Sequence, residues 1–320
     1  MQQDEVLELE RRLNTLSDPE ERLSVLLRLI DENVINDYVE GWKYSTEAVD
    51  LAQQLGHRAT IAKTHDALAN YLWKLGEYTE ALDNFEIAID NFLGLGDLHA
   101  VARCYCGMGI ICGVLQEYRT ALEYFEEGLS AARRVGKDQL AATLTGNIGH
   151  VYFQFGRYKD AVNCFQHSLD YYKEVDNPQG AANMISGMAG IHVYQGEYAK
   201  GLELVRRSLE LHRKAKHPRG IAVTMMNVGI ALQKMGKLEE AKKELKSALN
   251  YARSINFKPT EHDVLKALSE VCLELGQEEE SAKYLNLYME GEKEEKTQAV
   301  KRKTEQFRKR QEIKELSRKV

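Results

Sequence analysis

Apolar and small residues recur in this chain every three or four residues within short segments, and the segments themselves recur every forty residues. In the specimen segment 142–175, one stripe of such residues runs up to Gly156 and a second runs from Tyr158 to Leu169. This spacing predicts two amphipathic helices. Because glycine adopts the left-handed backbone that ends a helix, Gly156 predicts a turn between them. Each segment is therefore predicted to be a helical hairpin.

The forty-residue period extends through most of the chain. A fixed period of this kind indicates stacked units, each of which buries its apolar face against the next. Gln116 stands where the other units have glycine, so we expect a more strained turn there. The turn positions are Gly76, Gln116, Gly156, Gly196, Gly236 and Gly276, followed two residues later by Tyr78, Tyr118, Tyr158 and Tyr198.

Small and bulky residues also keep fixed places in the repeat. Two helices of a hairpin approach closely only where one presents a small residue, so we expect the bulky residues to fill the space beside the small ones. The small positions are Ala69, Gly109, Gly149, Ala189, Gly229 and Ser269 in the first helix, and Ala81, Ala121, Ala161, Gly201, Ala241 and Ser281 in the second, with Phe85, Phe125, Phe165, Val205, Leu245 and Leu285 as the bulky set.

The pattern resembles the tetratricopeptide repeat family, whose signature has Gly-x-Tyr-x-x-Ala followed by an aromatic and a small residue. It stands here as Gly76-Glu77-Tyr78 with Ala81, Phe85 and Ala88, and as Gly156-Arg157-Tyr158 with Ala161, Phe165 and Ser168. The resemblance covers roughly residues 36–285, with departures at Asn36, Leu238 and Glu278.

The resemblance implies an all-α fold, a right-handed superhelical solenoid of antiparallel helix hairpins with a long charged C-terminal helix. Repeats of forty residues imply longer helices and a broader groove than the family's form of about thirty-four residues. We expect N-terminal capping helices over residues 1–34, an array of about six to seven repeats over 35–288, and a charged helix over 289–320.

Composition and charge limit the cellular compartment and the kinds of partner that we expect. The chain has 320 residues, 43% of them hydrophobic and 29% charged, with a mean hydropathy of -0.46, as in soluble folded proteins. We see no apolar stretch of about eighteen residues and no basic and apolar leader, so we expect a cytoplasmic protein without membrane contact. The net charge is -6, and the nine Lys or Arg and three Glu of residues 299–320 leave -12 on the remainder. An acidic body is a poor match for nucleic acid.

Catalytic motifs are lacking in the sequence. It has no phosphate-binding glycine loop, no Gly-x-Ser-x-Gly elbow and no His-Glu-x-x-His pair. The histidines His150, His192 and His262 fall in different repeats. We therefore expect a non-enzymatic protein with no cofactor and no metal, and its five cysteines, without metal-binding spacing, as packed thiols. The cysteines are Cys104, Cys106, Cys112, Cys164 and Cys272.

The family resemblance implies a concave groove, lined by the first helices, that binds a protein or peptide. Asparagine suits such a surface because its amide both donates to and accepts from a peptide backbone. The alternative is that Asn147 and Asn227 satisfy neighbouring turns and that Phe153 packs in the core. The groove positions carried over are Asn70, Trp73, Arg103, Asn147, His150, Phe153, Gln154, Asn183, Tyr194, Asn227 and Gln233.

One branch of the family holds a chaperone's terminal carboxylate with a lysine and an asparagine in one repeat, an asparagine in the next, and then a lysine and an arginine. Here Asp66 stands in the lysine position and Gly107 in an asparagine position. That clamp is missing, so we do not expect an adaptor for chaperone tails.

The tail over residues 289–320 is rich in Glu, Lys, Arg and Gln. Val300 and Phe307 are seven residues apart, and Ile313, Leu316 and Val320 continue with an imperfect heptad. The tail therefore predicts either a solvated capping helix or a coiled-coil linker that makes a homodimer.

Residues 305–319 are similar to the helix that joins repeat regions to output domains in bacterial signalling proteins such as diguanylate cyclases, histidine kinases and adenylate cyclases. The sequence thus favours an interaction module that binds a peptide or partner helix in bacterial signalling. The alternatives are a signal-peptide or small-ligand sensor that controls an output domain, and a scaffold for several proteins.

Overall fold

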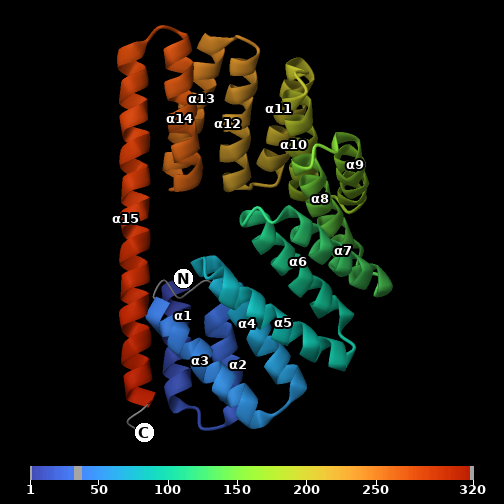
Figure 1. Ribbon diagram of the computed structural model, residues 1–320, viewed down its shortest axis with the longest axis vertical. Helices are drawn as coiled ribbons and strands as arrows, with labels where there is room; N and C mark the ends of the chain where they lie inside the picture. The colour runs from blue at the N-terminus through green and yellow to red at the C-terminus, as the bar shows by residue number, and fades with distance from the viewer. Residues whose placement is uncertain (1, 32–37, 318–320) are drawn as a thin grey trace. The chain divides into compact units, whose positions relative to one another are not determined.

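The computed structural model describes residues 2–31 and 38–317, and every element in these ranges is an α-helix. The predicted all-α class is confirmed. From α3 onward short turns join the helices, as expected for stacked hairpins (Figure 1). The helices are α1 (Gln2–Thr15), α2 (Pro19–Asp31), α3 (Tyr38–Leu55), α4 (Arg58–Leu75), α5 (Tyr78–Leu95), α6 (Leu98–Val114), α7 (Tyr118–Arg134), α8 (Asp138–Gln154), α9 (Tyr158–Glu174), α10 (Pro178–Tyr194), α11 (Tyr198–Lys214), α12 (Pro218–Lys234), α13 (Leu238–Ser254), α14 (Lys258–Glu274) and α15 (Glu278–Ser317).

The helices form two compact units. The first comprises Met1–Asn147 with Glu305–Val320, and the second comprises Ile148–Thr304. In the first unit α2 packs on α1, α3 and α4, and the hairpins α4–α5 and α6–α7 follow (Figure 1). In the second unit α9 packs on α10, the hairpins α10–α11 and α12–α13 follow, and α14 lies against α13. Apart from Glu305–Val320, each unit is thus built from helices that are neighbours in sequence.

The turn inside each hairpin has the predicted left-handed residue. Gly76 has φ 81° and its N–H donates to the carbonyl of Trp73, which closes the last turn of α4. Gln116, where glycine is missing, takes the same conformation with φ 62°. Since residues with a Cβ adopt positive φ only at a cost in free energy, this conformation agrees with the strain expected at Gln116.

The small and bulky positions meet as predicted. A Cβ added to Gly109 would lie 2.5 Å from Cε1 of Phe125, and one added to Gly229 would lie 2.5 Å from Cγ of Leu245. One member of the bulky set is a correction: Leu285 is 44% exposed. The reason is its place in the last hairpin, where no following repeat among the described residues covers that position. Close packing therefore holds within the array and ends with it.

The C-terminal helix is longer than the sequence suggested. α15 runs without a break from Glu278 to Ser317, so the predicted boundary between residues 288 and 289 falls inside it. Its first part completes the hairpin with α14, where Ser281 donates to the carbonyl of Ser269. Asn36 and Val320 lie outside the described residues, as do the side chains of Phe307, Ile313 and Leu316.

Membrane crossing finds no support in the described part of the chain. Over residues 2–31 and 38–317, none of the helices combines the length and the apolar character that a membrane span needs.

Candidate functional site

The first helix of each hairpin leaves one face uncovered. Arg103, Asn183, Val223 and Asp263 occupy the same repeat position in α6, α10, α12 and α14, and all four are exposed. We call this side of the first helices the open face. Residues seven and eleven positions further along each helix share the same side because of the helical period. The open face is where a partner could reach the protein without displacing a neighbouring repeat.

In the first unit the open face carries a polar cluster, formed by Asp66, Asn70, Arg103 and Cys104. The side chain of Asp66 is only 11% exposed. Arg103 of α6 donates from Nη2 to Oδ2 of Asp66, which lies on α4 in the preceding repeat, at a distance of 2.5 Å. Asn70 donates from Nδ2 to Oδ1 at 3.0 Å, and the thiol of Cys104 lies 3.7 Å from the same oxygen. Both carboxylate oxygens of Asp66 are thus engaged.

The surroundings of Cys104 and Cys106 determine how easily these two thiols lose their protons. Burial and the negative charge of Asp66 raise the pKa of Cys104 far above its usual range. Burial likewise raises the pKa of Cys106 to about 11, although the amide of Asn147, which donates to its sulfur at 3.7 Å, works in the opposite direction. Since the thiolate is the reactive form, these two cysteines are packed thiols instead of nucleophiles.

In the second unit Tyr194 lies on the open face of α10, and it forms an aromatic cluster with Phe153 of α8 and Tyr158 of the second helix α9. The ring of Tyr194 lies 5.3 Å from that of Tyr158 and 6.0 Å from that of Phe153, measured between centroids. Phe153 and Tyr158 are 5.9 Å apart, so each ring contacts the other two. A hydrogen bond with Tyr194 raises the pKa of Tyr158. Nevertheless Tyr194 is 68% exposed, the largest exposed fraction among the large apolar and aromatic side chains described.

His150 lies on the open face of α8. Its ring meets the ring of Phe165 edge-on, with 4.8 Å between centroids. Water reaches part of the residue, yet the protein that crowds its ring lowers the pKa of His150 from the usual range. A largely neutral imidazole at neutral pH can donate and accept one hydrogen bond each.

Of the remaining predicted site residues, some have side chains that water reaches and one is buried in a hydrogen bond to a neighbouring helix. Gln154 and Asn183 are exposed, while Trp73 and Asn227 are half-buried. Gln233 is only 7% exposed and donates to Oε1 of Glu274 at 2.6 Å. It occupies the repeat position of Trp73 and Phe153, which turns toward the neighbouring first helix. Gln233 is therefore a contact between α12 and α14 and not part of the open face.

Asn70 and Asn147 are also held by the protein itself. Asn70 donates to the backbone carbonyl of Asp66 and to its carboxylate, both within α4. Asn147 donates across to Cys106 of the preceding repeat. The donor groups of both amides are thus engaged within the protein, while their carbonyl oxygens can still accept a hydrogen bond.

Sequence reasoning passed over two residues that the structure places in these clusters. Asp66 attracted notice only as a mismatch to a clamp, and Tyr158 only as part of the repeat signature. A signal was available for each. Asp66 is a carboxylate in the middle of an apolar stripe, and Tyr158 follows Phe153 directly across the turn at Gly156.

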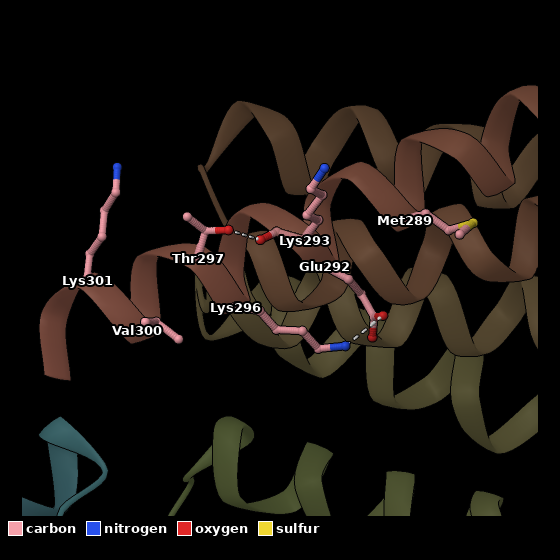
Figure 2. Close-up of a pocket in the computed structure, with 7 residues that line it drawn as sticks. All are labelled: Met289, Glu292, Lys293, Lys296, Thr297, Val300 and Lys301. Atoms are coloured by element: carbon pink, nitrogen blue, oxygen red, sulfur yellow. Dashed lines mark hydrogen bonds and ion pairs between the residues drawn. The ribbon is translucent and has the colours of Figure 1, made fainter. Parts of the chain in front are cut away.

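A third surface lies along α15 in the second unit. A shallow hollow of about 460 Å³ is lined by residues of this helix, with Met289 and Val300 59% and 65% exposed. Figure 2 shows Lys296 turned toward Glu292, and the hydroxyl of Thr297 turned toward the carbonyl of Lys293. Its polar groups are therefore largely satisfied by their own helix. The other lining residue is Lys301.

Metal ligands do not gather in the described part of the chain. Within it, no group of three or more His, Cys, Asp or Glu side chains is placed to hold a metal ion.

These features define a helical repeat protein with an open face on its first helices. A family model of the tetratricopeptide repeat matches residues 60–134, 101–174 and 180–254, which is more than half of the chain. The chain therefore belongs to the tetratricopeptide repeat family. A search of curated proteins finds no match.

Solved structures of the same fold include three with signalling roles in their names. One is a signal transduction ATPase with a tetratricopeptide repeat sensor from Pyrococcus horikoshii, with 16% identity, a TM-score of 0.66, and coverage of 92% of this chain but 45% of that one. Another is the Rap conjugation gene regulator of plasmid pLS20 in complex with the Phr* peptide, with 18% identity, a TM-score of 0.63, and coverage of 90% and 80%. The third is the apo quorum sensor NprR from B. thuringiensis, with 15% identity, a TM-score of 0.59, and coverage of 89% and 91%. At these identities the likeness is one of fold.

Proposed function

We propose that this protein is a non-enzymatic interaction module that binds a peptide segment of another protein on the open face of its first helices. The observation that carries the proposal is the exposure of Tyr194 within a fixed cluster of three rings. An aromatic side chain that is already held in place loses little conformational entropy on binding and offers a large apolar surface. Tyr194 is therefore suited to anchor an apolar side chain of the partner.

The surface of α10 next to this anchor suits a peptide backbone. Asn183 and Tyr194 lie eleven residues apart on the same side of α10, a distance of about 16 Å along the helix. Between them Gly190 is exposed, and a Cβ added there would meet nothing within 4 Å. An extended peptide of about five residues would span this length. The exposed amide of Asn183 could then pair with its backbone.

One comparison supports the choice of a peptide as partner. The Rap regulator of plasmid pLS20, which shares the fold, was solved with the Phr* peptide bound. The fold is thus compatible with peptide binding, and the proposal for this chain depends on its own residues.

The test is selection of binders from a displayed library of random peptides of roughly twelve residues, long enough to span the open face of one first helix. Binding of the recovered peptides is then measured for Tyr194→Ala and for Tyr251→Ala, a matched truncation on the second helix α13. We expect Tyr194→Ala to weaken binding about tenfold or more while Tyr251→Ala leaves it unchanged. Equal affinities for the two variants would contradict the proposal.

The sequence also led to predictions about the cellular role and the oligomeric state that this proposal does not include. A place in cytoplasmic bacterial signalling, a role as a sensor region that controls an output domain, and a homodimer through α15 stay predictions.

A further inference from the structure

We infer that two copies of this chain associate through α15, with the two helices side by side and running in opposite directions. The sequence predicts a homodimer through this helix but not the direction in which the helices run. The surface involved lies within residues 285–304, all in the second unit, and is separate from the open face. A homodimer here therefore adds to the proposed function and does not depend on it.

One side of α15 is covered by its own unit. Ser281 donates to the carbonyl of Ser269 on α14, and Tyr284 and Tyr288 pack against the buried core of the second unit. These contacts fix the orientation of the first part of the helix. The side chains on its other sides therefore face away from the hairpin.

The free side of α15 carries three exposed apolar side chains. Leu285, Met289 and Val300 are 44%, 59% and 65% exposed. Residue 289 lies about one turn beyond residue 285, and residue 300 about three turns beyond residue 289, so the three share one side of the helix. The hollow between Met289 and Val300 is lined, among the described residues, by α15 alone (Figure 2). This surface can therefore receive side chains from a second helix.

Charge complementarity favours a second copy of α15, in the opposite direction, as the occupant of this surface. Residues 285–295 contain four Glu and one Lys, a net charge of -3 (-4 plus 1), and residues 296–304 contain four Lys or Arg and no acidic residue, a net charge of +4. In a pair of helices that run in opposite directions, each acidic part lies beside a basic part. In a parallel pair each part would lie beside the same charge, which is unfavourable.

The apolar residues and the charges agree on one register. When Met289 of one copy lies opposite Val300 of the other, the two hollows face each other around a two-fold axis. Glu292 of each copy then lies within one residue of the level of Lys296 of the other, which is about 1.5 Å along the helix. Within one copy these two side chains form an ion pair of 3.4 Å that is exposed to water, so it is weak and each group is available to the other copy.

The first experiment measures the mass of the full chain by sedimentation equilibrium from about 5 to 500 µM, a range suited to a small transient interface. We expect the mass to rise with concentration from 36.5 kDa toward twice that value. Met289→Glu combined with Val300→Glu should remain at the monomer mass, because carboxylates of the two copies would then face each other across the contact. Both side chains are exposed, so the core is left intact.

Leu273→Glu is the matched control. Leu273 is 62% exposed and lies on α14 of the same unit, so this variant should dimerise like the unaltered chain. A monomer mass for the unaltered chain at every concentration would overturn the inference. So would a dimer that is lost in Leu273→Glu or kept in the double variant of α15.

The direction of the helices is tested by disulfide crosslinking. Met289→Cys and Val300→Cys are prepared as separate proteins and oxidised both alone and as a mixture. Opposite directions place residue 289 of one copy beside residue 300 of the other, so we expect a crosslinked dimer in the mixture and none in either protein alone. Four native cysteines are buried and Cys164 is half-buried, so the unaltered chain, oxidised in the same way, is the control for them.

Two results would contradict this arrangement. Crosslinking of Met289→Cys or Val300→Cys alone would show that the helices run in the same direction. A dimer that does not crosslink in the mixture would show that the copies meet at another surface. Either result leaves peptide binding on the open face unaffected, because the two surfaces share no residue.

Discussion

The ring of Phe125 on α7 occupies the space where a side chain at Gly109 of α6 would have to lie. Phe165 stands in the same relation to Gly149: a Cβ added to Gly149 would lie 2.9 Å from Cε1 of Phe165. Phe125 is only 4% exposed and Phe165 is fully buried, so neither ring can move aside into water. The hairpins are therefore held by a bulky side chain of one helix in contact with the backbone of the other.

Gly109→Ala should destabilise the protein. The new methyl group would overlap Cε1 of Phe125, and relief requires a shift of the buried ring or of α7. Overpacking of this kind costs roughly 1–3 kcal/mol, less the small gain in helix propensity that alanine brings. Urea unfolding of the purified variant measures the change.

Gly113→Ala in the same helix is the matched control. A Cβ at residue 113 meets nothing within 4 Å, so only the helix propensity changes. We expect the free energy of unfolding to stay equal or to rise by up to about 1 kcal/mol. Destabilisation by both variants to the same extent would contradict the packing account.

Gln116→Gly should stabilise the protein. Gln116 holds φ at 62°, as Gly156 does at 72° in the equivalent turn, and a residue without a Cβ adopts that conformation at lower cost. We expect a gain of roughly 1 kcal/mol, reduced by the larger conformational entropy of glycine in the unfolded chain. A lower melting temperature for Gln116→Gly would show that the turn is not strained.

Acid should destabilise the second unit through His212. This side chain is 2% exposed, and burial, together with the neighbouring His217 at 3.4 Å between Nδ1 atoms, lowers the pKa of His212 to about 4. The unfolded chain therefore binds a proton between about pH 6.5 and pH 4 that the folded chain does not, so stability falls as the pH falls through this window. After allowance for solvent screening we expect a loss of roughly 1–2 kcal/mol near pH 5 relative to pH 7.5.

His212→Tyr isolates this effect. Tyr172 occupies the equivalent place in α9, where it packs against Gly180 as His212 packs against Gly220. The variant should lose the pH-dependent part of the urea midpoint, while His167→Gln, which removes an exposed histidine, should keep it. An unchanged pH dependence in His212→Tyr would exclude His212 as its source.

Local periodicity made most of the fold predictable. The turn positions, the left-handed conformation of Gln116 and the contact of Phe125 with Gly109 follow from one repeat unit, because each unit meets its neighbours in the same way. The prediction failed where the repeat ends. Among the described residues no following unit covers Leu285. α15 runs through residue 288 without a break, so the helix does not mark the predicted boundary.

The site was less predictable than the fold. A repeat position states which side chains are near the open face, but not whether they are free. Gln233 faces Glu274 and Asn70 faces Asp66, and both bonds depend on the particular neighbour in another turn or repeat. Tyr194 was predicted from position, and the structure adds its ring contacts with Phe153 and Tyr158.

Photo-crosslinking tests most directly whether the open face binds the partner. A p-benzoylphenylalanine residue is placed at Gln154, exposed on the first helix α8 beside Phe153, or at Gln166, exposed on the second helix α9. The account predicts that a bound library peptide crosslinks at position 154 and not at 166, and that excess unlabelled peptide removes the crosslink. A crosslink at position 166 with none at 154 would contradict it.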